Sequence, residues 1–251
     1  KGSLPIKPSN HVADKKFGVF QSQLKFFKEL MNDLDMVDNI NNRFHRHPLA
    51  YLVEAADDIC YTIIDFEDGI NLGWISEDYA LEYFIKLVKD NIDTKKYNSL
   101  IHTSQRIAYL RSLAINNLIV DSVNQFLKNY QNIMTGQYPH ALLDKSKYKA
   151  QMEDIISISK EKVYRSENVL KKEIIGYKII NSLLKNITTA ALNKFHNKET
   201  SYDKLILRLI PKNHPIIDKK SIYKTFLNSA CFVASLSDSR AMQLEKSFFT
   251  L

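Results

Sequence analysis

Glycine and proline are scarce in this sequence, with six of each among 251 residues. A β-sandwich or β-barrel needs frequent turns, and turns depend on these two residues. Apolar residues instead recur three and four positions apart over long stretches, which is typical of amphipathic helices. We therefore expect an all-α fold with helices longer than average, in a chain that could form one large domain or two small ones.

The helical periodicity predicts several long segments separated by polar connections. Pro48 suits the first turn of one helix, and Gly69 could end that helix. Pro211 and Pro215 mark a loop late in the chain. The pattern contains no repeat and no clear domain boundary. The predicted helices are residues 14–34, 48–68, 76–90, 94–133, 148–195 and 219–248.

The composition limits the class of protein. The formal net charge is +7, which could favour a polyanion such as nucleic acid or a nucleotide phosphate group, or could simply keep the protein soluble. No apolar run approaches the roughly 18 residues of a membrane span, so no membrane partner is expected. Cys60 and Cys231 lie in apolar helical patterns, and we expect reduced thiols in a cytoplasmic protein.

The segment from Leu52 to Gly69 concentrates negative charge. It holds six acids, and no Lys or Arg lies between residues 51 and 70. A helix with 3.6 residues per turn collects most of these acids, together with one tyrosine, on a single face. That acidic face comprises Glu54, Asp57, Asp58, Tyr61, Asp65 and Asp68, and the opposite face comprises Leu52, Ile59, Ile63, Phe66 and Ile70.

The acidic face has two interpretations. It could be a solvated outer surface, although such surfaces usually mix both signs because like charges four residues apart repel each other. It could instead be a partly buried row whose desolvation is offset by a divalent metal or by basic groups from another element. Ala55 and Ala56 beside the acids indicate close packing, and the pattern favours the functional interpretation.

Two families of metal-binding helical proteins share features with this segment. All-α isoprenoid synthases use an Asp-Asp-x-x-Asp motif, but here the third carboxylate after Asp57 and Asp58 is missing. The string RHPLAYLVEAADDICY (residues 46–61) instead resembles the deoxyguanosine triphosphate triphosphohydrolases, or dGTPases, of the HD-domain superfamily. Further segments match in the order of that family, namely residues 3–8, 14–18, 20–22, 65–68, 114–119, 173–177 and 237–241.

This resemblance covers essentially the whole chain and implies the C-terminal part of a helical, HD-domain-like hydrolase fold. Family members are phosphoric monoester hydrolases that cleave a deoxynucleoside triphosphate, in one step, to the deoxynucleoside and inorganic triphosphate. The resemblance implies that Asp57 binds a divalent metal, with magnesium or manganese suited to a carboxylate ligand. It implies that Tyr61 and Asp65 bind the deoxyribose, and that Lys15 or Lys16 reaches the triphosphate.

Spacing and neighbouring residues bear on these assignments. Asp57, Tyr61 and Asp65 lie one helical turn apart and span about 12 Å, which suits a sugar held beside a metal-bound phosphate. Lys224 falls where some relatives place a phosphate-directed Arg, in a region that aligns poorly. Arg46 and the histidine after it open the acidic helix and are expected to be structural, with Arg46 pairing with nearby acids.

The sequence departs from the family at the metal site. The family's other ligands are a His and an adjacent His-Asp pair upstream of the acidic helix, but none of the seven histidines here is followed by Asp. We therefore expect residues 1–251 to be the C-terminal part of one triphosphohydrolase domain in a longer enzyme, and to be inactive alone. In this division, about 1–75 completes the active site and about 76–251 forms a helical subdomain.

The predicted function is metal-dependent hydrolysis of dGTP, or of further dNTPs, in the intact protein. The family also implies a homo-oligomer, such as a hexamer, and a single-stranded DNA or nucleotide effector. One alternative is a catalytically incomplete helical module that binds nucleotides or nucleic acid and regulates another activity. A purely structural helical interaction domain is the third. Base preference does not follow from the sequence.

Overall fold

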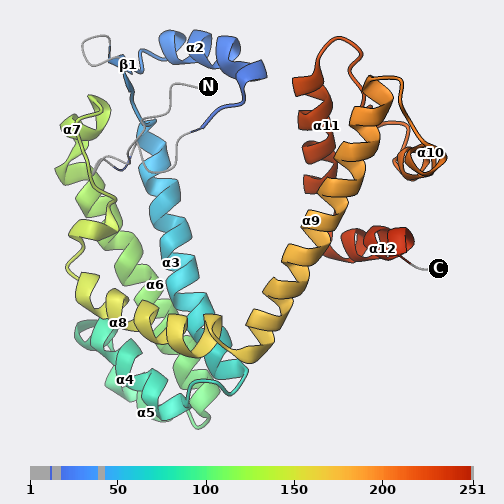
Figure 1. Ribbon diagram of the computed structural model, residues 1–251. Coiled ribbons are helices and arrows are strands. Elements are labelled where there is room, and N and C mark those ends of the chain that lie inside the picture. Colours follow the sequence, from blue (N-terminus) through green and yellow to red (C-terminus); the bar gives the residue numbers. More distant parts are fainter. Residues whose placement is uncertain (1–11, 13–17, 39–42, 250–251) are drawn as a thin grey trace. The chain divides into compact units, whose positions relative to one another are not determined.

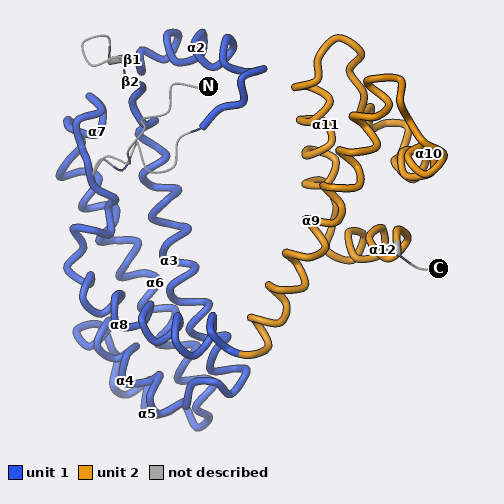
Figure 2. Tube along the Cα trace, viewed as in Figure 1, with its two compact units in different colours: residues 1–166 blue, residues 167–251 orange. Residues whose placement is uncertain are grey.

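A computed structural model describes residues 12, 18–38 and 43–249 (Figure 1). The fold is all-α, as predicted, apart from one short antiparallel hairpin among the described residues. The hairpin joins β1 (Val37–Asp38) to β2 (Arg43–Phe44), with Val37 opposite Phe44. Internal contacts divide the chain into two compact units, residues 1–166 and 167–251 (Figure 2). Each unit is described separately.

Unit 1 is built around the long helix α3, which packs against α6 and α8, while α4 packs against the same two helices (Figure 1). Its core is apolar and continuous, and includes Tyr51, Ile63, Phe66, Phe84 and Leu118. Its helical elements are η1 (Gln21–Gln23), α2 (Leu24–Asp33), α3 (Pro48–Asn71), α4 (Glu77–Val88), η2 (Lys89–Asn91), α5 (Thr94–Ser99), α6 (Thr103–Lys128), α7 (Tyr130–Met134), η3 (Leu143–Lys145), α8 (Lys149–Ser159) and the π-helical turn η4 (Lys160–Tyr164).

Unit 2 is organised by the second half of α9, against which the other three helices pack. Its core includes Leu183, Ile187, Ala190 and Ala191 on α9, and Phe232 on α11. The small alanine side chains let neighbouring helices approach α9 closely. The helices are α9 (Glu167–Phe195), α10 (Ser201–Arg208), α11 (Ile222–Ala234) and α12 (Asp238–Phe249).

Several predicted helices are interrupted. The segment 94–133 is three helices, because the Asp93 side chain caps α5 and a capping box at His102 starts α6. The segment 148–195 breaks after η4, and 219–248 divides between α11 and α12. In the first predicted helix, residues 14–17 lie outside the described residues, residues 18–20 are not helical and helical structure is present from residue 21; α10 was missed. Apolar periodicity continues across these breaks, so it does not register the polar caps that end one helix and begin the next.

The prediction that Gly69 ends α3 is wrong. The helix continues to Asn71, and Gly73 (φ +73°) follows its last turn in the left-handed conformation that favours glycine. Gly69 is buried inside the helix, where an added Cβ would lie 2.7 Å from Val163 Cγ2 and 2.8 Å from Ile75 Cδ1. Its role is therefore to admit close packing against α3.

The structure bears on three expectations drawn from the sequence, which concern the division of the chain, the cysteines and membrane-spanning segments. Residues 76–166 pack with α3 in unit 1, while the assignment of the chain to one triphosphohydrolase domain stays a prediction. Both cysteines are exposed free thiols. In the part of the chain that is described, no helix combines the length and apolar character needed to cross a bilayer.

Candidate functional site

The outer face of α3 carries the predicted site residues. Asp57 and Tyr61 are exposed, with Tyr61 60% accessible, and Asp65 is half-buried. Opposite them, Ile59, Ile63, Phe66 and Ile70 are buried in the core of unit 1, while Leu52 is partly buried. The amphipathic helix predicted from the sequence is confirmed, and it presents Asp57, Tyr61 and Asp65 on successive turns of its accessible side.

Two glutamates of the acidic segment are structural. Arg46 Nη1 lies 2.6 Å from Glu54 Oε2, and Arg111 Nη1 on α6 lies 2.6 Å from Glu67 Oε2, in pairs whose side chains are largely buried. The Arg46 guanidinium also stacks over Tyr51, at 4.9 Å from the ring centroid. The predicted pairing of Arg46 with a nearby acid is confirmed, and basic groups from other segments offset these two charges.

Asp57 differs from these glutamates, because no hydrogen bond or ion pair holds it among the described residues. A free carboxylate suits a metal ligand, but one carboxylate cannot form a site. Within residues 18–38 and 43–249, no group of three or more His, Cys, Asp or Glu side chains could hold a metal ion. The residues described therefore do not complete a metal centre, and the role of Asp57 stays a prediction.

Three lysines are candidates for binding phosphate. Lys15 and Lys16 lie outside the described residues, so their prediction is untested. Lys224 is on α11 in unit 2, where its Nζ lies 3.8 Å from Asp218 Oδ2 in a partly exposed ion pair. The phosphate-directed role of Lys224 stays a prediction.

Tyr164 joins the candidate site from a distant part of the sequence. Its phenol, at the end of η4, donates a hydrogen bond to Asp65 Oδ2 on α3. Burial, followed by this hydrogen bond, raises the pKa of Tyr164 to about 12, so the phenol remains a donor at neutral pH. The close packing of Val163 on Gly69 holds η4 against α3 at this point. Sequence reasoning missed Tyr164 because 99 positions separate it from Asp65 and no local spacing connects them.

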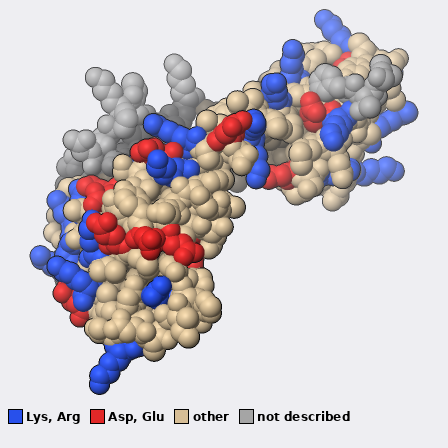
Figure 3. Space-filling model, turned by 90° about the horizontal axis from the view of Figure 1, so that it is seen from below, with Lys and Arg blue, Asp and Glu red and all other residues tan. Residues whose placement is uncertain are grey.

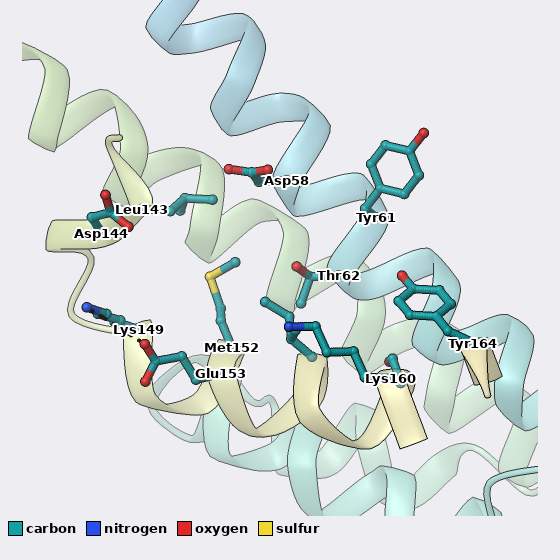
Figure 4. A pocket seen from close by; sticks show the side chains of 12 residues that line it. Asp58, Tyr61, Thr62, Leu143, Asp144, Lys149, Met152, Glu153, Lys160 and Tyr164 are labelled. Atoms are coloured by element: carbon teal, nitrogen blue, oxygen red, sulfur yellow. Dashed lines mark ion pairs between the residues drawn. The ribbon is translucent and has the colours of Figure 1, made fainter. Parts of the chain in front are cut away.

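A cavity of about 410 Å³ lies beside these residues, between α3 and the α8–η4 segment (Figure 4). Tyr61 and Tyr164 stand at one side of it, and Met152 contributes an apolar wall. Ser159 also lines the cavity, but its hydroxyl is buried away from solvent and has no hydrogen-bond partner among the described residues. The volume and the mixture of apolar, aromatic and hydrogen-bonding groups are those of a small-molecule pocket.

Comparisons with known proteins bear on this site. No family model matches the chain. It is 30% identical to a deoxyguanosinetriphosphate triphosphohydrolase-like protein of Pseudomonas aeruginosa, over 92% of this chain and 53% of the relative. A protein of the same description from Synechocystis sp. is 28% identical over 92% of this chain and 51% of the relative. The deoxyguanosinetriphosphate triphosphohydrolase of Cronobacter sakazakii is 27% identical over 72% and 38%, respectively.

The matches extend through both units rather than through the acidic helix alone. The chain spans about half the length of the curated relatives that match most of it. The chain is therefore similar, over nearly its whole length, to proteins described as deoxyguanosinetriphosphate triphosphohydrolase-like, in agreement with the resemblance in its sequence.

Proposed function

We propose that the protein containing this chain hydrolyses dGTP, or a wider set of deoxynucleoside triphosphates, to the deoxynucleoside and inorganic triphosphate. The observation that carries the proposal is the accessible face of α3 in a chain similar to these triphosphohydrolases. Asp57 is unpaired there among the described residues, Tyr61 is exposed, and Asp65 meets Tyr164 at the edge of a cavity of about 410 Å³.

Each side chain has a chemical task in this proposal. Asp57 is a hard oxygen ligand suited to magnesium or manganese, and further ligands must come from outside the described residues. A divalent ion bound there would supply Lewis acidity and lower the pKa of a bound water. Tyr61 offers an aromatic face to the sugar, and the Asp65 carboxylate can accept a hydrogen bond from a sugar hydroxyl. Lys15 or Lys16 would neutralise the triphosphate.

Replacing Asp57 tests the proposal in the full-length protein. We expect Asp57→Ala to lower tripolyphosphate release from dGTP by at least about 10³-fold, because a lost metal ligand removes charge stabilisation in the transition state. The melting temperature should stay unchanged, since Asp57 is exposed and unpaired among the described residues. Ion chromatography of the products after incubation with each dNTP measures the release.

Matched variants make this result specific. Asp68→Ala removes another exposed acid from the same helix and should leave release at the parent level. Tyr61→Ala and Asp65→Ala should raise KM for dGTP more than they weaken metal binding. Parent-level release from Asp57→Ala would contradict the metal-ligand assignment, and absence of release from the parent protein with every dNTP would contradict the proposed function.

The distribution of charge favours one alternative function. Unit 1 has 21 basic and 21 acidic residues, whereas unit 2 has 14 basic and 7 acidic residues, so the net charge of +7 belongs to unit 2. Lys and Arg predominate on the face of unit 2 in Figure 3. A helical module that binds nucleic acid or nucleotides would use this charge. Salt-dependent binding of single-stranded DNA without triphosphate release would support it, and an effector or homo-oligomer in the active enzyme stays a prediction.

A further inference from the structure

The cavity beside α3 contains a lysine that the proposed function leaves without a task. Lys160, the first residue of η4, lines this cavity, and Figure 4 shows its ammonium group pointing into it. Lys149 also lines the cavity, but its Nζ is paired with Glu153 Oε1 at 3.7 Å. Within the part of the chain that is described, no such ion pair holds Lys160. Its three N–H donors are therefore available to a bound ligand.

The charge of the lining argues against a phosphate group in this cavity. Besides the two lysines, its wall includes three carboxylates, those of Asp58, Asp144 and Glu153. The wall thus carries more negative than positive charge, and a triphosphate would be repelled by it. One ammonium group without an ion pair, in a wall that is otherwise acidic, suits an uncharged ligand that presents hydrogen-bond acceptors.

The apolar part of the lining suits a flat ring. Leu143 and Met152 are buried, Ile156 is half-buried, and the rings of Tyr61 and Tyr164 stand at one side (Figure 4). Nucleobases are recognised by this combination, in which aromatic and apolar side chains contact the ring faces and polar groups bind the ring edge. The cavity volume of about 410 Å³ lies within the range of small-molecule pockets.

The position proposed for the sugar leaves this cavity for the base. In the proposed function, Tyr61 and Asp65 bind the deoxyribose, and Asp57, one turn before Tyr61, binds the metal beside the triphosphate. Tyr164, which donates a hydrogen bond to Asp65, also lines the cavity. The base and the triphosphate leave the sugar from different carbons, so a sugar held at Asp65 with its triphosphate toward Asp57 can extend its base into the cavity. This step rests on the proposed function.

We infer that the cavity binds guanine and that Lys160 selects it by donating hydrogen bonds to O6 and N7. Guanine carries these two acceptors side by side, which is why Arg and Lys are its commonest specific partners in complexes with DNA. Adenine presents an amino donor beside N7, cytosine presents an amino donor at the corresponding edge, and thymine offers only O4 there. None of the three gives an ammonium group a pair of acceptors. Lys160 is thus the residue that determines a preference for dGTP.

Replacing Lys160 in the full-length protein tests this inference, because Lys160→Met keeps the length of the side chain but removes its donors. We expect kcat/KM for tripolyphosphate release from dGTP to fall at least about tenfold, and that for dATP to fall less than about threefold, since one specific base contact discriminates by this order. The base contact is made before and during the reaction, so KM should rise while kcat stays near the parent value. Lys162→Met, which changes an exposed lysine paired with Glu161, is the matched control and should leave all four dNTPs unaffected.

A substrate analogue separates a base contact from a general loss of structure. 7-Deaza-dGTP lacks the N7 acceptor, so the parent should use it less well than dGTP. Lys160→Met should show no such difference, because the donor for N7 is already gone. Lys160→Arg, which restores two donors suited to O6 and N7, should recover the preference for dGTP. Equal losses with dGTP, 7-deaza-dGTP and dATP in Lys160→Met would overturn the inference, since they would reflect a displaced η4 rather than a lost base contact.

Nucleoside binding separates this inference from the proposed function. Titration calorimetry with deoxyguanosine and deoxyadenosine needs no hydrolysis, and we expect the parent to bind deoxyguanosine more tightly and Lys160→Met to bind the two equally. If the parent releases no triphosphate from any dNTP but shows this Lys160-dependent preference, the proposed function fails and the guanine site stands. If the parent releases triphosphate and Lys160→Met keeps its base preference, the proposed function stands and the inference is wrong. A parent protein without any preference for deoxyguanosine would also overturn the inference.

Discussion

Two aspartates, one in each unit, are almost equally buried but have opposite surroundings. Asp203 in unit 2 is 4% exposed and Asp121 in unit 1 is 7% exposed. Asp203 Oδ2 accepts hydrogen bonds from Thr200 N (2.8 Å), Thr200 Oγ1 (2.8 Å) and Asn193 Nδ2 (3.0 Å). Asp121 accepts none among the residues described. Asp65, which is half-buried, lies between these extremes with the single phenol donor of Tyr164.

The difference follows from where each aspartate lies in its helix. Asp203 occupies the third position of α10, where it forms a capping box with Thr200 and satisfies a backbone N–H that has no intrahelical partner. Asp121 lies well inside α6, where every neighbouring N–H already bonds along the helix. A buried carboxylate at a helix start is thus explained by the helix, whereas one in mid-helix requires a partner from elsewhere.

Removing the Asp203 carboxylate, which accepts three hydrogen bonds, should have the largest effect on stability. Asp203→Ala leaves Thr200 N, Thr200 Oγ1 and Asn193 Nδ2 without their acceptor and removes the carboxylate half of the α10 capping box. We expect a loss of about 3 kcal/mol in the stability of unit 2, since hydrogen bonds to charged groups contribute about 1.5–3 kcal/mol each and are not additive. Hydrogen exchange of the α10 amides in the full-length protein measures it.

Acid titration supplies the control for Asp203. The Thr200 backbone hydrogen bond, with help from Asn193 and the Thr200 hydroxyl, lowers the pKa of Asp203 below its ordinary 3.8. The resulting stabilisation is complete above pH 3.8 and is lost as the pH falls through the lowered value. In Asp203→Asn, the free energy of unfolding should therefore fall less as the pH is lowered below 3.8. The same pH dependence in the parent and in Asp203→Asn would show that the donors do not stabilise the carboxylate.

Disturbing the packing behind Asp65 should have an intermediate effect. In Gly69→Ala the new methyl group would overlap Val163 and Ile75, which overpacks the contact between α3 and η4. We expect a net loss of about 1 to 2 kcal/mol and a higher KM for dGTP, because Tyr164 would shift from Asp65. Gly176→Ala on α9, where no atom lies within 4 Å of the added Cβ, is the matched control and should be neutral or stabilising. Equal melting temperatures for the two variants would refute the packing argument.

Deleting the single donor to Asp65 should have the smallest effect. Tyr164→Phe removes one hydrogen bond at a partly exposed site, so we expect a loss of about 0.5 kcal/mol in the free energy of unfolding. Tyr177→Phe, which changes an exposed tyrosine on α9, serves as control in urea unfolding. A loss as large as that expected for Asp203→Ala would mean that Asp65 depends on Tyr164 as strongly as Asp203 depends on its capping box.

Much of the fold was predictable because apolar periodicity records which face of a helix is buried. The face of α3 with Ile59, Ile63 and Phe66 was identified correctly from spacing alone. Helix ends were less predictable, as the caps at Asp93 and His102 depend on side-chain hydrogen bonds that periodicity does not contain. Gly69 was misassigned because the sequence does not distinguish a glycine that ends a helix from one that leaves space for a packed side chain, here those of Val163 and Ile75.

The candidate site likewise has some features that the sequence predicts and others that only the packing of the helices shows. The sequence alone determined the similarity to the triphosphohydrolases, the all-α class and the placement of Asp57, Tyr61 and Asp65 on one line of one helix, because these depend on residues close together in the chain. Only the tertiary structure decided that Arg111 holds Glu67, that Tyr164 meets Asp65, and that the Asp121 Oδ2 atom is buried without a hydrogen bond among the described residues. Those contacts join residues distant in sequence or depend on burial, and both are set when the helices pack together.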